Sequence, residues 1–115
     1  MRTGIWLDKQ NAFIVKIDQD VESLVVLKSE IDNKDFEKDL NQLKEYSNSI
    51  LHEVDNTEEL VLVGQEEMLE HFHKHIESTN KNLFDKVIAV REEDNITENQ
   101  IKSYVKNFFI REIKV

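Results

Sequence analysis

The chain reads Leu60-Val61-Leu62-Val63-Gly64 near its middle and Val87-Ile88-Ala89-Val90 further on, two short apolar runs typical of buried strands. An amphipathic segment from Glu66 to Thr79 separates the two runs, and another follows from Thr97 to Phe109. This alternation predicts two strand–helix units, in which parallel strands are covered by helices.

The first 27 residues have a different pattern. Three apolar, largely β-branched runs, Ile5–Leu7, Ala12–Ile17 and Leu24–Leu27, are separated by polar breaks at Asp8–Asn11 and Asp18–Asp20. Breaks this short favour antiparallel hairpins, because aspartate and asparagine suit tight turns.

A helix is predicted between the two patterns, since apolar residues from Phe36 to Val54 recur with helical spacing. Asn33 or Asp35 is a suitable N-cap. Residues 110–115 fit either an extension of the last helix or a short strand.

The predicted order is β-β-β-α-β-α-β-α. Because crossover connections are right-handed, the fourth and fifth strands should run parallel to the first. We therefore predict an α/β fold with a ribonuclease-H-like mixed five-stranded sheet of order 3-2-1-4-5, with strand 2 antiparallel and helices on both faces.

Composition limits the function further. With 115 residues, 39% of them hydrophobic and 34% charged, the chain is expected to form one domain, residues 1–115. It has no cysteine, which excludes disulfides and thiol catalysis. No apolar run reaches the roughly 18 residues of a membrane helix, and the N-terminus does not resemble a secretory signal. We expect a cytoplasmic protein without a membrane partner.

The net charge of −9 argues against broad, non-specific binding to nucleic acid, because phosphate backbones are repelled at long range. The net charge does not exclude a local basic contact on an RNA–protein assembly. Tyr104 between Lys102 and Lys106 is the one hint of base stacking.

Several segments resemble the middle domain of archaeal and eukaryotic peptide-chain release factors and of Pelota. They are Gly4–Asp8 with Ala12–Val15, Glu59–His75, and Leu83–Val90 with Thr97–Ile101. The sequence is also similar to small, stand-alone bacterial proteins grouped with translational machinery components. The resemblance covers most of the chain and implies this domain's fold, with the ribosome or a translation factor as partner.

In release factors, the loop after the third strand carries a Gly-Gly-Gln motif that promotes peptidyl-tRNA hydrolysis. The corresponding loop here, Ser29–Asp35, is acidic and has no glycine. Gly64-Gln65 follows the fourth strand instead, where the small bacterial relatives often carry Gly-Pro-Gly. The resemblance therefore implies a non-catalytic binding module without a cofactor.

The histidines at 71, 73 and 75 are candidate ligands. His71 and His75 share one helix face at the spacing that zinc proteases use, but Phe72 stands where their glutamate would be. A polar helix margin explains them better, and a pH-sensitive cluster is the alternative. We assign no metal site.

Asp8 is a second candidate, because ribonuclease-H-like nucleases hold magnesium with an aspartate on the first strand. Two-metal chemistry needs several carboxylates, so Asp18 and Glu92–Asp94 would have to converge on Asp8. A hairpin turn explains Asp8 more simply. A metal-dependent nuclease or phosphoesterase is the alternative function, and a homo-oligomer formed through a sheet edge or the first helix is another.

Gly64 and Gln65 end a parallel strand before a helix, the place where open α/β sheets bind ligands. Glu66 and Glu67 already satisfy the helix dipole there and would repel an anion. Gly64 is better explained as relieving backbone crowding. A partner or ligand surface is thus expected at Asp8, Gly64, Gln65, His71 and His75.

Two features are expected to be structural. Thr97–Gln100 matches a capping box. The predicted aromatic core residues are Trp6, Phe13, Phe72, Phe84, Phe108 and Phe109.

Overall fold

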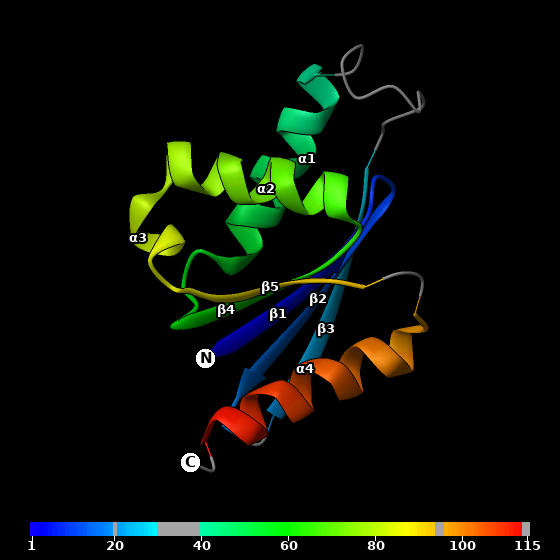
Figure 1. Cartoon of the computed structure of the whole chain (residues 1–115), viewed down its shortest axis with the longest axis vertical. Helices are drawn as coiled ribbons and strands as arrows, with labels where there is room; N and C mark the ends of the chain where they lie inside the picture. The colour runs from blue at the N-terminus through cyan, green and yellow to red at the C-terminus, as the bar shows by residue number, and fades with distance from the viewer. Residues whose placement is uncertain (20, 30–39, 94–95, 114–115) are drawn as a thin grey trace.

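A computed structural model describes residues 1–19, 21–29, 40–93 and 96–113 (Figure 1). The elements are β1 (Arg2–Leu7), β2 (Asn11–Asp18), β3 (Val21–Lys28), α1 (Leu40–Val54), β4 (Glu59–Gly64), α2 (Glu66–Thr79), α3 (Lys81–Phe84), β5 (Val87–Glu92) and α4 (Glu98–Ile113). The predicted order is confirmed, with the short α3 added. Residues 110–113 continue α4, so the helix extension was the correct alternative. Asn33 and Asp35, the predicted caps of α1, lie outside the described residues.

The sheet has the order β3-β2-β1-β4-β5. β1 pairs antiparallel with β2 and parallel with β4, and β4 pairs parallel with β5. β2 and β3 form the second hairpin. The predicted order and the antiparallel second strand are confirmed. β2 occupies one edge of β1, so β4 pairs with the other edge.

Helices cover both faces of the sheet (Figure 1). α1, α2 and α3 lie on one face, and α4 lies alone on the other. The alternation of side chains along β1 divides the core accordingly: Ile5 and Leu7 pack with Phe72 on the first face, whereas Trp6 packs with Val105 on the α4 face. None of the described helices is long and apolar enough to span a membrane.

The predicted aromatic core is confirmed, although three of its members are only partly buried. Trp6, Phe72 and Phe109 are buried, and the other three pack against the two core clusters: Phe13, Phe84 and Phe108. The capping box is also confirmed. The Gln100 amide donates to Thr97 Oγ1 (3.2 Å), and the Thr97 amide donates to Gln100 Oε1 (2.8 Å).

Gly4 allows α4 to lie close to the sheet. A Cβ at this position would overlap the γ carbons of Val105, a buried residue of α4. Both positions lie inside a packed core, where a stiff valine side chain has little room to move.

Gly4→Ala should therefore destabilise the protein by about 1–3 kcal/mol, the usual cost of overpacking. Val105→Ala removes the atoms that the new methyl group would meet, so the double variant should lose less stability than the two single variants together. Urea unfolding of the four proteins in a double-mutant cycle measures this coupling. Strictly additive losses would contradict the contact.

Candidate functional site

Four strands end at the same edge of the sheet. β1, β3, β4 and β5 run in one direction, and the register aligns Leu27, Leu7, Gly64 and Glu92 across that edge through Ala12 of β2. Ligands of α/β sheets bind outside the carboxyl ends of the strands. This carboxyl edge is therefore the first place to look for a site.

Asp8 organises the hairpin turn at this edge. Its Oδ1 accepts hydrogen bonds from the backbone amides of Gln10 (2.8 Å) and Asn11 (2.7 Å). The Asp8 amide donates to the Asn11 carbonyl (3.0 Å). The predicted turn is confirmed, and one oxygen of the Asp8 carboxylate accepts hydrogen bonds from the backbone of the turn. The described residues contain no group of three or more His, Asp or Glu side chains placed to hold a metal ion.

Gly64 lies where β4 approaches the end of β1. Its φ is +142°, and a Cβ there would run into the carbonyl oxygen of Leu7. The amide of Gln65 donates to that same oxygen (3.2 Å), and the amide of Glu93 donates to the Gly64 carbonyl (2.9 Å). The prediction that Gly64 relieves backbone crowding is confirmed. The crowding comes from the backbone of β1 at Leu7.

Gln65 directly precedes α2 in an extended conformation, and its side chain does not cap the helix. Glu66 and Glu67 occupy the first turn of α2, as expected for residues that satisfy the helix dipole. Lys9 Nζ lies 3.5 Å from Glu67 Oε2, which joins the hairpin turn to this helix. The structure thus brings Asp8, Gly64 and Gln65 together at one edge.

The histidines lie further along α2. His75 is nine residues beyond Glu66, about 13 Å along the helix axis. Its Nε2 bonds Asn48 Oδ1 of α1 (2.7 Å), and burial, followed by the charge of Lys44, lowers the pKa of His75. His71 is exposed on the same helix. His75 therefore joins the two helices and lies apart from Asp8 and Gly64.

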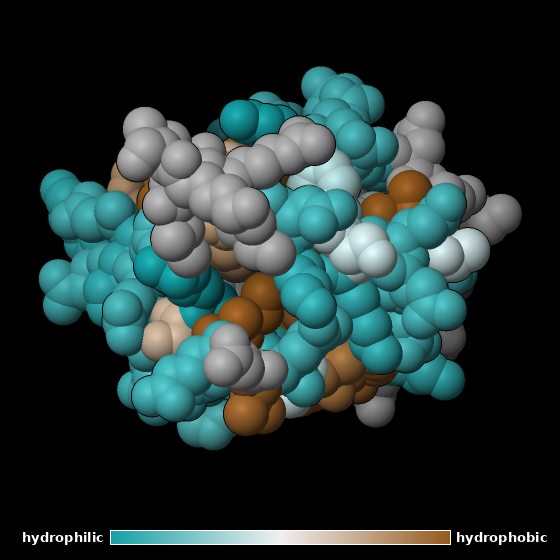
Figure 2. Space-filling model, turned by 90° about the horizontal axis from the view of Figure 1, so that it is seen from below, coloured by the Kyte–Doolittle hydropathy of each residue, from teal (hydrophilic) through white to brown (hydrophobic). Residues whose placement is uncertain are grey.

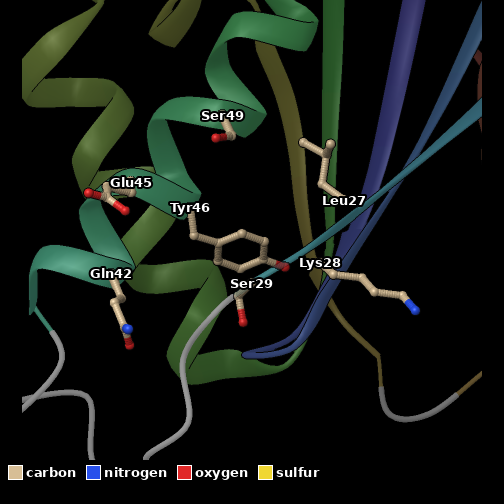
Figure 3. A pocket seen from close by; sticks show the side chains of 7 residues that line it. All are labelled: Leu27, Lys28, Ser29, Gln42, Glu45, Tyr46 and Ser49. Atoms are coloured by element: carbon tan, nitrogen blue, oxygen red, sulfur yellow. The ribbon is translucent and has the colours of Figure 1, made fainter.

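A cavity of ≈220 Å³ lies beside the hairpin turn, at a place that the sequence did not indicate (Figure 3). Its walls are the end of β3, with Ser29 that follows it, and one side of α1. They consist of Leu27, Lys28, Ser29, Gln42, Glu45, Tyr46 and Ser49. In Figure 3 the Tyr46 ring extends from α1 toward the end of β3, whereas the Lys28 ammonium group points away from α1.

Tyr46 and Ser29 tie both walls of the cavity to the turn. The Tyr46 hydroxyl donates to the Asp8 carbonyl (3.1 Å). The Ser29 amide donates to the Gln10 carbonyl (2.8 Å), and its hydroxyl donates to the Lys9 carbonyl. Burial, and then the Asp8 carboxylate, raises the pKa of Tyr46. The phenol therefore keeps its proton, and its role as a donor, beyond the pH at which an exposed tyrosine ionises.

The remaining cavity wall is polar and of mixed charge. The amide oxygen of Gln42 is buried without a hydrogen-bond partner in the part of the chain that the structure describes. Glu45 contributes a carboxylate and Ser49 a hydroxyl group. Such a surface can exchange hydrogen bonds with a polar partner. Sequence reasoning missed it because these residues are simply the polar positions of an amphipathic helix.

No protein-family model matches the sequence, and no curated protein matches it. Several solved structures do match, among them the following two. Pelota of Archaeoglobus fulgidus aligns with a TM-score of 0.68 over 97% of this chain at 9% identity. The archaeal translation termination factor aRF1 aligns with a TM-score of 0.57 over 96% at 11% identity. The chain spans 32% of the first structure and 39% of the second. The predicted resemblance to the release-factor and Pelota domain is confirmed, and it concerns the fold.

Removing the Tyr46 hydroxyl should loosen the turn. Tyr46→Phe is expected to cost about 0.5–1.5 kcal/mol at neutral pH, the usual contribution of a hydrogen bond. Urea unfolding measures the loss. Tyr104→Phe, on half-buried Tyr104 of α4, is the matched control and should stay within about 0.5 kcal/mol of the wild type.

The raised pKa of Tyr46 also predicts a pH dependence. The folded protein keeps this proton above pH ~10, where the unfolded phenol loses it. The contribution to stability is therefore complete below that pH and falls as the pH rises, by up to about 1.4 kcal/mol per unit. The stability difference between wild type and Tyr46→Phe should shrink in unfolding experiments above pH ~10. A difference that stays constant would contradict the prediction.

Gly64→Ala should cost about 3 kcal/mol, because both the positive φ and the Leu7 carbonyl oppose a side chain. The obstacle is backbone, so no neighbouring side-chain truncation should restore stability, in contrast to the pair Gly4 and Val105. Urea unfolding of Gly64→Ala, alone and combined with Val105→Ala, tests this contrast. A variant within about 1 kcal/mol of wild type would contradict it.

Proposed function

We propose that this chain is a non-catalytic binding module of the translation apparatus, which contacts the ribosome or a translation factor. The observation that carries the proposal is the fold shared with Pelota at a TM-score of 0.68, combined with a loop after β3 that has no glycine. The second solved structure, aRF1, is a translation termination factor by its own description.

The absence of catalysis follows from the loop that Ser29 begins. Release factors are expected to need a Gly-Gly-Gln motif there, because a backbone carrying two glycines can adopt conformations closed to other residues. The sequence here is Ser29-Glu30-Ile31-Asp32-Asn33-Lys34-Asp35. Its negative charge also opposes close approach to RNA phosphates.

The polar cavity at the base of this loop supports a binding role. Ser29 lies in its wall, and Gln42, Glu45 and Ser49 face it from α1. Tyr46 and the Asp8 turn hold those walls in place. A surface supported by a sheet and by a helix whose inner side is buried loses little conformational entropy when a partner binds. We place the partner contact here.

Co-sedimentation tests the proposal. The purified chain, added to ribosomes of its own organism at physiological salt, should enter the ribosomal pellet. Glu45→Lys changes the charge of the cavity rim and should shift the chain to the supernatant. Glu77→Lys makes the same change in charge on an exposed position of α2 and is the matched control; it should remain in the pellet.

Three results would count against the proposal or part of it. A wild-type chain that stays in the supernatant, with ribosomes taken both from growing and from stressed cells, would remove the translation role. Release of peptide from ribosome-bound peptidyl-tRNA by the chain alone would instead contradict the non-catalytic part. If Glu45→Lys and the wild type bound ribosomes equally, the partner contact would not be at the cavity.

A further inference from the structure

β3 forms one edge of the sheet, and among the described residues no strand pairs with its outer side. Edge strands usually carry a central charge, a proline or a bulge, which prevents pairing with other chains. The centre of β3 has none of the three. It reads Leu24-Val25-Val26-Leu27, four consecutive apolar residues. This edge therefore lacks the usual protection.

The opposite edge is different. The pairing of β5 with β4 contains a register shift between Leu60 and Val61. Irregular pairing of this kind is one of the devices that block strand addition, and the pairing of β3 with β2 has none. Only β3 of the two edges is thus suited to pair with another strand.

The hydrogen bonds of β3 show which of its backbone groups are directed outward. The Ser29 amide donates to the Gln10 carbonyl of the β2 side, 2.8 Å away. Antiparallel strands alternate between residues that bond one neighbour and residues that face away from it. The even-numbered residues therefore direct N–H and C=O groups away from β2: Glu22, Leu24, Val26 and Lys28.

These outward residues are complementary to a second copy of themselves. When two β3 strands lie antiparallel with Val25 on the two-fold axis, Glu22 faces Lys28 and Leu24 faces Val26. Each opposed pair can exchange two backbone hydrogen bonds. A shift of two residues in either direction would place Glu22 opposite Val26 or Lys28 opposite Leu24. Charge and hydrophobicity together select a single register.

The side chains favour the same arrangement. All four even-numbered residues are on the α4 face, because Val26 and Leu24 neighbour Phe13 and Val15 there. Val26 is 40% exposed, and Figure 2 shows separate apolar patches on the face of the molecule that is seen from below. In the described residues, neither Glu22 nor Lys28 has an ion-pair partner. A second copy would cover Val26 with Leu24 and supply a partner for both charges.

We propose that β3 pairs antiparallel with β3 of a second copy of this chain, about a two-fold axis at Val25, so that the two five-stranded sheets form one continuous sheet. The pairing is isologous, and every contact therefore occurs twice. The pairing does not require the proposed translation role, although the end of β3 also lines the cavity. Its test measures the mass of the chain in the absence of ribosomes, so either proposal can fail without the other.

Sedimentation equilibrium of the full chain, from low micromolar to near-millimolar concentration, should show a mass rising from 13.6 kDa to twice that value. Glu22→Lys and Lys28→Glu each place like charges opposite one another and should raise the dissociation constant by roughly tenfold, because the repulsion occurs at two symmetric positions. The double variant restores opposite charges and should return to within about threefold of wild type. Glu77→Lys, with the same change in net charge as Glu22→Lys, should have no effect.

Val26→Pro tests the backbone contact. Proline removes an outward N–H and leaves the pairing with β2 intact, so the variant should keep its circular dichroism spectrum and remain monomeric. A mass of 13.6 kDa at every concentration of wild type would overturn the proposal, even if the monomer bound a strand of another protein. The proposal would also be overturned if Val26→Pro formed a dimer with the same dissociation constant as the wild type. Dimers weakened by both single reversals but not restored by the double variant would refute the register.

Discussion

β1 forms hydrogen bonds along both edges and is buried on both faces, and the other elements are placed relative to it. Its ladder with β2 is antiparallel and its ladder with β4 is parallel, which makes it the strand where hairpin and crossover parts meet. Two glycines make this possible for different reasons. Gly4 leaves room for a side chain of α4, and Gly64 leaves room for the Leu7 carbonyl. The close packing of β1 thus depends on two positions without a side chain.

The end of β1 also organises the carboxyl edge of the sheet. Asp8 closes the hairpin turn, and the turn accepts hydrogen bonds from Tyr46 of α1 and from Ser29 after β3. An ion pair of Lys9 connects it to α2. The walls of the polar cavity are consequently anchored to the turn that follows a buried strand. Rigid support of this kind favours recognition, because the side chains of the surface lose little conformational entropy when a partner binds.

The parts of the fold that were predicted correctly depend on neighbours in sequence. The apolar runs of β4 and β5, the Asp8 turn and the capping box at Thr97 involve residues at most a few positions apart, and such patterns are visible in a single chain. The helix α3 was missed because four residues are too few to show a helical period. The cavity was missed because Gln42, Glu45 and Ser49 gain their role only when β3 lies beside them.

The sequence by itself determined the type, order and direction of all elements except the short α3, since side-chain periodicity and right-handed crossovers leave few alternatives. Only the tertiary structure decided which distant groups meet. Tyr46 reaches the Asp8 carbonyl across 38 positions, and His75 bonds Asn48 across 27. It also decided the register of β3 on β2, and therefore which backbone groups of this predicted edge strand are directed outward. These contacts depend on how closely whole elements pack, which is a property of shape in three dimensions that no local pattern encodes.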